Sequence, residues 1–384
     1  MPKLKLMTVL GTRPEIIRLS AVIRCADRYF DHVLVHTGQN YAPELNDVFF
    51  RDLQLRKPDY YLEAVGADLG ETLGSIIAKS YKVMLAEKPD ALLVLGDTNS
   101  ALSAISAKRL KIPIFHMEAG NRCWDWNVSE MINRKIVDHI SDINLPYTEH
   151  SRRYLLSEGI DGKTVFVTGS PMREVLEAAL PQIEQSDALA RLGLEKGRYI
   201  LVSAHREENI DLEGPFFSLM DAINQIAETY QVPVIYSTHP RTRKFIEQRG
   251  YTFHPLVRNI QPLGFFDYNC LQRNSLAVLS DSGTLSEESA MLGFCGVLIR
   301  TSTERPEVLD KGTVVVGGVS AKSVLQATEL AIAMQRADEP RAMPADYADA
   351  NVSVKVVKLI QSYTSIVNET VWLKSPLTVF ENDG

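Results

Sequence analysis

Long apolar runs, paired cysteines and blocks of like charge are all missing from this sequence of 384 residues. No stretch of about 18 consecutive apolar residues occurs, so the sequence predicts no membrane-spanning helix. The four cysteines lie far apart without a CxxC pair, which argues against a disulfide framework. The first residues, MPKLKLMTVLG, reach a glycine too soon for the apolar core of a signal peptide. We therefore expect reduced thiols and a cytoplasmic protein.

Basic character is also scarce. The 41 Lys and Arg residues are outnumbered by 48 Asp and Glu, which gives a formal net charge of −7, and the basic residues are scattered. This balance argues against nucleic acid as a partner, but it leaves room for a small anion in a local pocket. A composition with 45% hydrophobic and 23% charged residues is typical of a globular protein and excludes disorder, collagen-like repeats and coiled coil.

Short runs rich in Val, Ile and Leu alternate with stretches of helical period along nearly the whole chain. This alternation is typical of parallel sheets covered on both faces by helices. The pattern restarts after the polar segment GLEKGR, at about residue 193. The expected strands are LKLMTVLG, HVLVHTG, ALLVLGD, IPIFHME, DINLPY, TVFVTGS, RYILVSAH, VPVIYSTHP, LAVLSD and CGVLIR.

The predicted fold class is therefore α/β, with two Rossmann-like, doubly wound domains. We place the N-terminal domain at residues 1–185 and the C-terminal domain at residues 186–350. The remaining residues, 351–384, are predicted to form a helix and tail that can pack back on the N-terminal domain.

Polar or glycine-rich clusters follow six of the expected strands. The carboxyl edge of a parallel sheet is where ligands bind, so such clusters are candidate site residues. Turn preferences explain any single cluster equally well, but the repeated His, Asp, Glu and Arg favour a ligand site. The clusters are Gly11-Thr12-Arg13, His36-Thr37-Gly38-Gln39, Gly96-Asp97-Thr98, His116-Met117-Glu118, Ala204-His205-Arg206 and Asp281-Ser282-Gly283.

Two strand-to-helix turns are candidates for binding phosphate. The segment Ser280–Thr284, followed by LSEESAML, resembles a helix start, whose amide groups suit a phosphate oxygen. A capping box explains the same residues, and on spacing alone it is favoured. In the turn Gly11–Glu15, Arg13 and the nearby Arg18 have forked donors that can reach a diphosphate.

Other common motifs are absent. Neither GxxxxGK[ST] nor GxGxxG occurs, which argues against a P-loop ATPase and a nicotinamide-binding unit. Without HExxH or GxSxG, the zincin and α/β-hydrolase interpretations fail. His116-x-Glu118 resembles a zinc deaminase, but the PCxxC half is missing, so no metal site is predicted. Trp124 and Trp126 are either part of a sugar-stacking wall or a loop packed on the surface.

Taken together, the motifs of the chain resemble those of the non-hydrolysing UDP-N-acetylglucosamine 2-epimerase family over nearly its whole length. The matching segments, in family order, are GTRPEII, HTGQNY, GDTNS, HMEAGNR, EMINRKIVDH, TGSP, SAHREEN, STHPR, SDSGTLSEE and RTSTERPE. The resemblance implies a glycosyltransferase-B fold and a cytoplasmic homodimer that needs no metal or nicotinamide cofactor. It also implies inversion of C2 through anti elimination of UDP to a 2-acetamidoglycal, followed by re-addition.

The resemblance also assigns roles to individual positions. The family's catalytic acids fall on Asp97, Glu118 and Glu130, and its histidine that supports the departing diphosphate falls on His205. Proton transfer on two opposite faces of a sugar requires more than one carboxyl group. The UDP-binding positions that carry over are Arg13, Arg18, Ser282, Gly283, Thr284, Glu288 and Arg305, with Glu288 on the ribose hydroxyls. In some relatives the substrate also binds as an allosteric activator near the segment matching Gln39–Tyr41.

Within the family, FDHVLVHTGQNY, LRKPDYYL and HMEAGNRC are most similar to the branch that makes UDP-N-acetyl-L-fucosamine for capsule and O-antigen lipopolysaccharide. Two positions depart from the family. Met131 stands where a second Glu is usual, which predicts a drier pocket suited to a 6-deoxy sugar, and Arg18 stands where many relatives have Lys. Interconversion of UDP-GlcNAc and UDP-ManNAc is the alternative reaction. A glycosyltransferase of the same fold and a non-catalytic UDP-sugar sensor are the alternatives of other classes.

Overall fold

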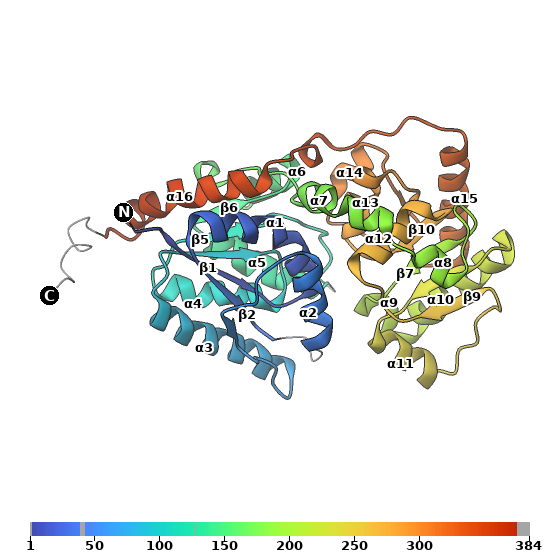
Figure 1. Ribbon diagram of the computed structural model, residues 1–384, viewed down its shortest axis with the longest axis horizontal. Helices are drawn as coiled ribbons and strands as arrows, with labels where there is room; N and C mark the ends of the chain where they lie inside the picture. The colour runs from blue at the N-terminus through green and yellow to red at the C-terminus, as the bar shows by residue number, and fades with distance from the viewer. Residues whose placement is uncertain (1, 39–42, 127, 375–384) are drawn as a thin grey trace. The chain divides into compact units, whose positions relative to one another are not determined.

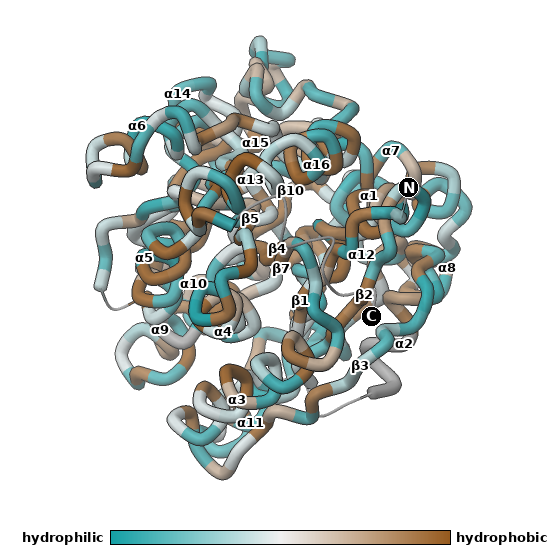
Figure 2. Tube along the Cα trace, turned by 90° about the vertical axis from the view of Figure 1, so that its left-hand side faces the viewer, coloured by the Kyte–Doolittle hydropathy of each residue, from teal (hydrophilic) through white to brown (hydrophobic). Residues whose placement is uncertain are grey.

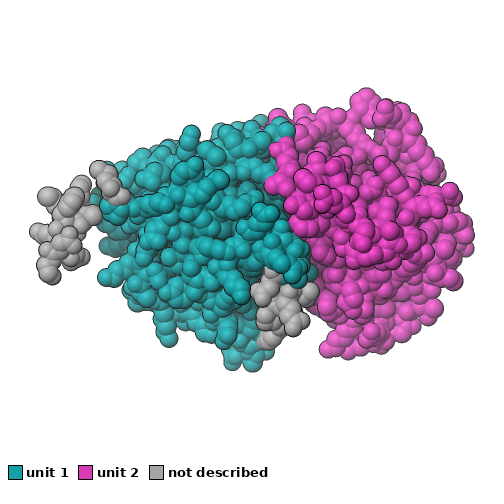
Figure 3. Space-filling model, viewed as in Figure 1, with its two compact units in different colours: residues 1–175, 348–384 teal, residues 176–347 magenta. Residues whose placement is uncertain are grey.

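The computed structural model describes residues 2–38, 43–126 and 128–374. The chain forms two compact units (Figure 3): unit 1 comprises residues 1–175 and 348–384, and unit 2 comprises residues 176–347. The division between them falls inside helix α7 (Met172–Gln185), whereas the sequence interpretation places a boundary after residue 185. The last helix of the chain is counted with unit 1.

Unit 1 is built on a six-stranded sheet in which each neighbouring pair is parallel (Figure 1). The order β3-β2-β1-β4-β5-β6 is the 3-2-1-4-5-6 arrangement of a doubly wound sheet. Its strands are β1 (Lys5–Leu10), β2 (Asp31–His36), β3 (Tyr60–Tyr61), β4 (Ala91–Leu95), β5 (Ile114–Met117) and β6 (Ile143–Leu145). Its helices are α1 (Arg13–Tyr29), α2 (Pro43–Asp52), α3 (Leu69–Glu87), α4 (Ser103–Arg109), α5 (Glu130–Ile140), α6 (Glu149–Ser157), α16 (Val352–Thr370) and the short 3₁₀ turns η1 (Asn99–Leu102) and η2 (Gly162–Thr164).

Unit 2 repeats this architecture. The order β12-β11-β10-β7-β8-β9, counted from β7, is again 3-2-1-4-5-6, and its pairs are parallel. The strands are β7 (Ile200–Ser203), β8 (Val234–Ser237), β9 (Val257–Ile260), β10 (Ala277–Ser280), β11 (Gly296–Leu298) and β12 (Val315–Val316). The helices are α8 (Ala188–Leu192), α9 (Glu207–Ile210), α10 (Glu213–Tyr230), α11 (Pro240–Gln248), α12 (Phe265–Asn274), α13 (Thr284–Leu292), α14 (Pro306–Asp310), α15 (Ala321–Arg336) and the 3₁₀ turn η3 (Ala345–Tyr347).

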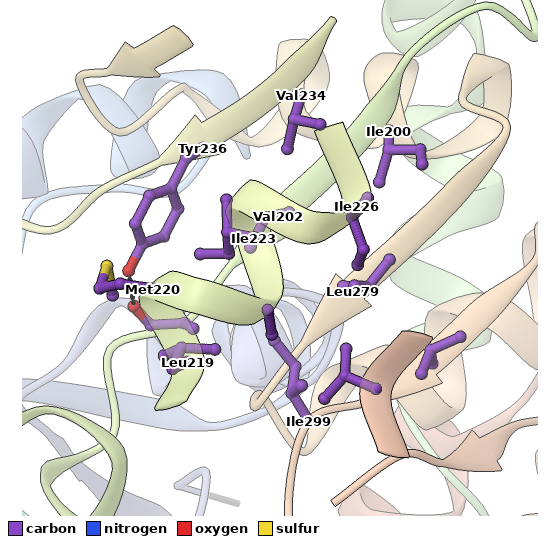
Figure 4. Close-up of a cluster of buried hydrophobic side chains, with 14 of the residues drawn as sticks. Ile200, Val202, Leu219, Met220, Ile223, Ile226, Val234, Tyr236, Leu279 and Ile299 are labelled. Atoms are coloured by element: carbon purple, nitrogen blue, oxygen red, sulfur yellow. Dashed lines mark hydrogen bonds between the residues drawn. The ribbon is translucent and has the colours of Figure 1, made fainter. Parts of the chain in front are cut away.

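Apolar side chains fill both faces of the unit 2 sheet. On one face, Ile200 and Val202 of β7 pack with Ile223 and Ile226 of α10 (Figure 4), while Leu201 belongs to the core of the opposite face. Successive strand residues point to opposite sides, so a strand buried on both faces reads as a continuous apolar run. Helices such as α3 instead alternate hydrophobic and hydrophilic residues as they turn (Figure 2).

The structure confirms the α/β, doubly wound fold class, but one expected strand is wrong. Residues 164–170, the segment TVFVTGS, form only an isolated bridge from Val165 to Asn144. Their partner β6 has only three residues, and Gly169 adopts a left-handed φ of 85°. The ladder is therefore too short to extend, although Phe166 N still donates to Asn144 O at 3.0 Å. The short edge strands β3, β9 and β12 are absent from the sequence interpretation.

Two further features bear on the sequence predictions. All four cysteines are buried and free of disulfides. Among the residues described, no helix combines the length and apolar composition that crossing a membrane requires.

Candidate active site

Each sheet has one place where the strand order reverses, and some of the predicted site residues follow the strands that flank it. The reversal lies between β1 and β4 in unit 1 and between β7 and β10 in unit 2. At such a point the two connections leave in opposite directions, and open α/β sheets bind ligands beside it. Arg13 and Asp97 follow the two strands in unit 1, and His205 and Ser282 follow the two in unit 2.

The turn after β1 is held by a buried carboxylate that the sequence interpretation did not select. Glu15 accepts hydrogen bonds from Gly11 N at 3.0 Å, from Thr12 Oγ1 at 2.8 Å and from Ser100 Oγ. Burial raises the pKa of Glu15, although these bonds oppose the rise. Because Ser100 lies in η1, just beyond Asp97, Glu15 ties together the turns that follow β1 and β4. The spacing Thr12-x-x-Glu15, that of a capping box, is the signal that could have revealed it.

Arg13 and Arg18 both lie on α1, the helix that this turn begins. The Arg13 guanidinium lies 5.8 Å from the ring centroid of Phe49, and burial lowers the pKa of Arg13. Arg18 is buried and its NH1 forms an ion pair with Glu118 Oε2.

The carboxylates of Asp97 and Glu118 follow neighbouring strands. Leu95 of β4 pairs with Met117 of β5, so the two acids lie at the same sheet edge. Glu118 is buried, and a Cβ placed on Gly96 would lie 3.5 Å from its Oε2. The structure therefore brings these two predicted acids together.

Each of these acids has a basic partner and an amide contact. Asp97 forms an ion pair with Arg134, and its carbonyl oxygen accepts from Asn133 Nδ2 at 3.0 Å. Asn121 Nδ2 lies 3.3 Å from Glu118 Oε1, beside the Arg18 pair. Glu118 also has a left-handed φ of 60°, a strained conformation for a residue other than glycine that persists only where the surroundings enforce it.

Glu130, the third predicted acid, is the first residue of α5. Its Oε2 lies 3.1 Å from Ser129 Oγ. It precedes Arg134 by four residues, which places both on one face of the helix. Helix α5 thus carries Glu130 on the same face as the arginine that pairs with Asp97.

The loop before α5 contains the two tryptophans, and the second residue of α5 is the departure at position 131. Met131 is 1% exposed and packs with Cys123 and Val128. Trp124 and Trp126 are exposed, and Lys135 Nζ lies 5.8 Å and 5.4 Å from their ring centroids. The two rings therefore lie around a lysine on the surface of unit 1.

In unit 2, the turn that carries His205 is held by Asp281. This residue is completely buried, and its Oδ2 accepts from His205 N and Arg206 N, both at 2.8 Å, and from Asn209 Nδ2 at 3.1 Å. The His205 side chain is 47% exposed, with Nδ1 3.7 Å from Asp281 Oδ1. The backbone of His205 is therefore fixed while its imidazole reaches the surface of the unit.

The start of α13 does not form the capping box that the spacing favours. Gly283 occupies the cap position, and Ser282 Oγ accepts from Thr284 N at 3.3 Å. Glu287, which a capping box would turn back toward the helix start, instead lies 3.3 Å from Arg305 NH2.

The remaining UDP-binding candidates lie in a buried charged network. Glu288 accepts from Gln272 Nε2 at 2.7 Å, and Arg305, which pairs with Glu287, is 2% exposed. Sequence reasoning missed the neighbouring pair of Arg300 and Glu304, whose two nitrogen–oxygen contacts are 3.0 Å and 3.2 Å. Residues 300–304 are not helical, so the spacing of this pair gave no signal in the sequence.

Two doubly wound sheets, with a carboxylate at the switch point of one and a helix start at that of the other, define an α/β enzyme of the glycosyltransferase-B type. Residues 24–361 match the family model described as UDP-N-acetylglucosamine 2-epimerase, and the chain belongs to this family. The protein is thus an isomerase with the general activity of a nucleotide-sugar 2-epimerase.

Known relatives cover the chain almost completely. A structure of UDP-N-acetylglucosamine 2-epimerase from Rickettsia bellii is 44% identical and covers 97% of this chain and 100% of its own, with a TM-score of 0.89. The Methanocaldococcus jannaschii UDP-GlcNAc 2-epimerase in complex with UDP-GlcNAc and UDP is 32% identical and covers 94% and 100%, with a TM-score of 0.87. The UDP-2,3-diacetamido-2,3-dideoxy-D-glucuronate 2-epimerase of Pseudomonas aeruginosa is 31% identical over 93% of this chain and 100% of its own.

These findings confirm the family and the fold. The roles of the individual site residues stay predictions, and the segment Gln39–Tyr41 lies outside the described residues.

Proposed function

We propose that the protein inverts C2 of a UDP-N-acetylhexosamine by anti elimination of UDP and re-addition of UDP to the resulting 2-acetamidoglycal. The observation that carries this proposal is the pair of carboxylates, Asp97 and Glu118, on adjacent strand ends, each against an arginine. The UDP-GlcNAc and UDP held by the Methanocaldococcus jannaschii relative support a UDP-sugar as the substrate.

The chemistry requires charge to develop in a set order. The C2–H bond of a sugar is not acidic, so the C1–O bond to UDP must begin to break first, and its electron pair leaves on the diphosphate. A carboxylate then takes the C2 proton, and the electrons of that bond form the C1–C2 double bond. In the return half, a carboxylic acid protonates C2 from the opposite face while the diphosphate oxygen attacks C1.

The proposed roles follow from these requirements. Asp97, Glu118 and Glu130 are the acid and base groups. The departing diphosphate gains negative charge, which cationic groups stabilise, and this is the role we assign to Arg13, Arg18 and His205. Ser282, Gly283 and Thr284 hold phosphate oxygens, Arg305 supports UDP, and Glu288 binds the ribose.

For the sugar, we propose UDP-2-acetamido-2,6-dideoxy-L-talose, converted to UDP-N-acetyl-L-fucosamine for capsule or O-antigen. The buried, apolar contacts of Met131 support a 6-deoxy sugar, which has one hydroxyl fewer to solvate. The names of the relatives favour a second candidate, the interconversion of UDP-GlcNAc and UDP-ManNAc. Homodimeric assembly and a cytoplasmic location stay predictions from the resemblance.

Deuterium exchange tests the reaction directly. The protein is incubated with each UDP-sugar in D2O, without any acceptor, and C2 is followed by NMR. Deuterium at C2 with UDP retained is the expected result, and the sugar that exchanges identifies the substrate. No exchange with any candidate sugar contradicts the proposal. An acceptor requirement would instead indicate a glycosyltransferase.

The role of Glu130 is tested by Glu130→Gln. Because the amide cannot take or give the proton, we expect UDP binding to persist while C2 exchange falls about 10²- to 10⁴-fold. The matched control is Glu149→Gln, since Glu149 is also the first residue of a helix in unit 1 and its side chain is exposed. Turnover of Glu130→Gln near the wild-type rate would show that Glu130 is not an acid or base.

A further inference from the structure

A buried contact between a histidine and a carboxylate lies next to the sheet edge that carries Asp97 and Glu118. His116 of β5 is completely buried, and its Nδ1 lies 2.9 Å from Oδ1 of Asp138, which is 1% exposed and lies on α5. Neither residue is among the predicted site residues of the proposed mechanism. Burying two such groups costs free energy unless each has fixed partners, so their other contacts show what the pair does.

The carboxylate of Asp138 holds the chain on both sides of Glu118. This carboxylate contacts the imidazole of His116, which lies two residues before Glu118. Gly120 N, two residues after Glu118, donates to both oxygens of Asp138 at 3.2 Å each. Arg122 NH1 lies 2.8 Å from the second carboxylate oxygen, Oδ2. Burial raises the pKa of Asp138, but His116 and Arg122 outweigh this and hold it below its usual value, so the acceptor is anionic.

The conformation between these anchors needs such support. Glu118 has a φ of 60° and Gly120 a φ of 79°, both in the left-handed region. No other residue fits at position 120, because a Cβ on Gly120 would lie 2.5 Å from Ser151 O. A turn of this kind persists only where its surroundings determine it, and the hydrogen bonds of Asp138 are placed to do so.

The other ring nitrogen of His116 contacts the residue that precedes the second acid, Asp97. Nε2 lies 2.7 Å from the carbonyl oxygen of Gly96, and a carbonyl only accepts, so Nε2 donates. Gly96 directly precedes Asp97 and itself has a left-handed φ of 68°. One imidazole thus connects the turn after β4 to the carboxylate that holds the turn after β5.

We propose that His116 and Asp138 form a positioning pair that fixes Asp97 and Glu118 relative to each other. The inference rests on the proposed function, since it assigns the pair to the acid and base groups of that reaction. Two acids that serve opposite faces of one sugar ring must keep their separation within a fraction of an ångström, and a 1 Å misplacement costs about 10²-fold in rate.

Asp138→Asn tests the pair, because it removes the charge while keeping the shape of the side chain. We expect kcat for C2 epimerisation to fall about 10²-fold. KM and the affinity for UDP, measured by calorimetry, should change less than about threefold, because the carboxylate of Asp138 contacts His116, Gly120 and Arg122 and none of these is a candidate UDP-binding residue.

Asp142 provides a matched control, because it contacts the first residue of β5, the strand that carries His116. The side chain of Asp142 is also buried, and its carboxylate accepts from Ile114 N at 2.9 Å and contacts Lys108 Nζ at 2.6 Å. Asp142→Asn should lower the melting temperature as Asp138→Asn does, but leave kcat near the wild-type value. A purely structural role of Asp138 predicts the same kcat for both variants.

A second pair of variants keeps the inference testable if Asp138→Asn does not fold. His116→Gln retains an N–H donor for Gly96 O, whereas His116→Leu does not, so kcat of His116→Gln should exceed that of His116→Leu at temperatures where both are folded. Equal kcat in these two variants, or an Asp138→Asn kcat within about twofold of wild type, overturns the positioning pair while wild-type exchange upholds the proposed function. An absence of C2 exchange in the wild-type protein overturns both.

Discussion

Carboxylates at the two sheet edges lie against arginines or rows of amide donors. The buried Glu118 and Glu287 lie against Arg18 and Arg305, and the partly exposed Asp97 lies against Arg134. Removing one member of such a pair leaves an uncompensated buried charge, which is strongly destabilising. At the scale of single residues, the local pairing of charges therefore matters more to this site than the net charge of the chain.

Glu158 shows how strongly one side chain can depend on such a pairing. Both of its oxygens accept from Arg122, at 2.9 Å and 2.7 Å, and Lys135 Nζ adds a contact of 3.1 Å. These partners, Arg122 first, lower the pKa of Glu158 to about 2 from its ordinary 4.5. Its stabilising contribution is therefore complete above about pH 4.5 and is lost as the pH falls towards 2.

Glu158→Gln should accordingly lower the melting temperature at pH 6, and the difference from wild type should shrink as the pH falls from 4.5 to 2. Calorimetric melting curves across this range measure it, with Glu149→Gln as a control whose exposed pair contributes little. A difference that stays constant down to the lowest pH would contradict the assignment.

At the scale of elements, α5 brings the polar residues of one helix face to the sheet edge. Glu130, Asn133, Arg134 and Asp138 follow one another at intervals of three, one and four residues, which places them on one side of the helix. Ile132 and Ile136 lie elsewhere on it and are exposed, at 51% and 38%. The sequence interpretation selected only Glu130 and Met131 on this helix, because the orientation of the helix toward β4 does not follow from a local pattern.

The start of α13 gives a prediction at the same scale. A Cβ at Gly283 would meet nothing closer than 3.7 Å, and φ there is −63°, so Gly283→Ala should fold with an unchanged melting temperature. If a UDP phosphate approaches this backbone, the added methyl group should weaken UDP binding at least about tenfold, measured by calorimetry.

Gly264 provides the matched control, because it is the cap residue of α12 in the same unit and a Cβ there would meet nothing within 4 Å. Gly264→Ala should leave the affinity for UDP unchanged. Equal UDP affinity of both variants and the wild type would count against phosphate binding at α13.

At the scale of the whole molecule, the last helix belongs to unit 1. Helix α16 packs against α1 (Figure 1), and Ile360, on α16, is completely buried. The chain thus leaves unit 1 after residue 175 and returns to it at residue 348. The stability of unit 1 therefore depends on residues more than 300 positions from α1 in the sequence.

Ile360→Ala should lower the free energy of unfolding by about 2–5 kcal/mol, because it opens a cavity against α1. Hydrogen exchange should quicken in α1 and leave α10 of unit 2 unchanged. Ile366→Ala, at a position 44% exposed on the same helix, should have a small effect. Equal acceleration in α1 and α10 would show that the two units unfold together.

Much of the architecture could be predicted from the sequence. Strands such as Lys5–Leu10 and Asp31–His36 are strongly patterned segments, and the structure has them as expected. The two-residue strands β3 and β12 could not be predicted, since a pattern that short carries no periodicity. The strand predicted at residues 164–170 was wrong for the opposite reason. Their pattern is that of a strand, but the partner strand β6 is too short.

The sequence by itself determined the α/β class, the family and the strand ends at which Asp97, Glu118, His205 and Ser282 stand, because these follow from local patterns and motifs. Tertiary structure alone decided which groups meet: Arg134 with Asp97, Glu287 with Arg305, and His116 with Asp138. The physical reason is that a charge is buried only where a partner reaches it, and partners far apart in sequence are brought together by the order of strands in the sheet.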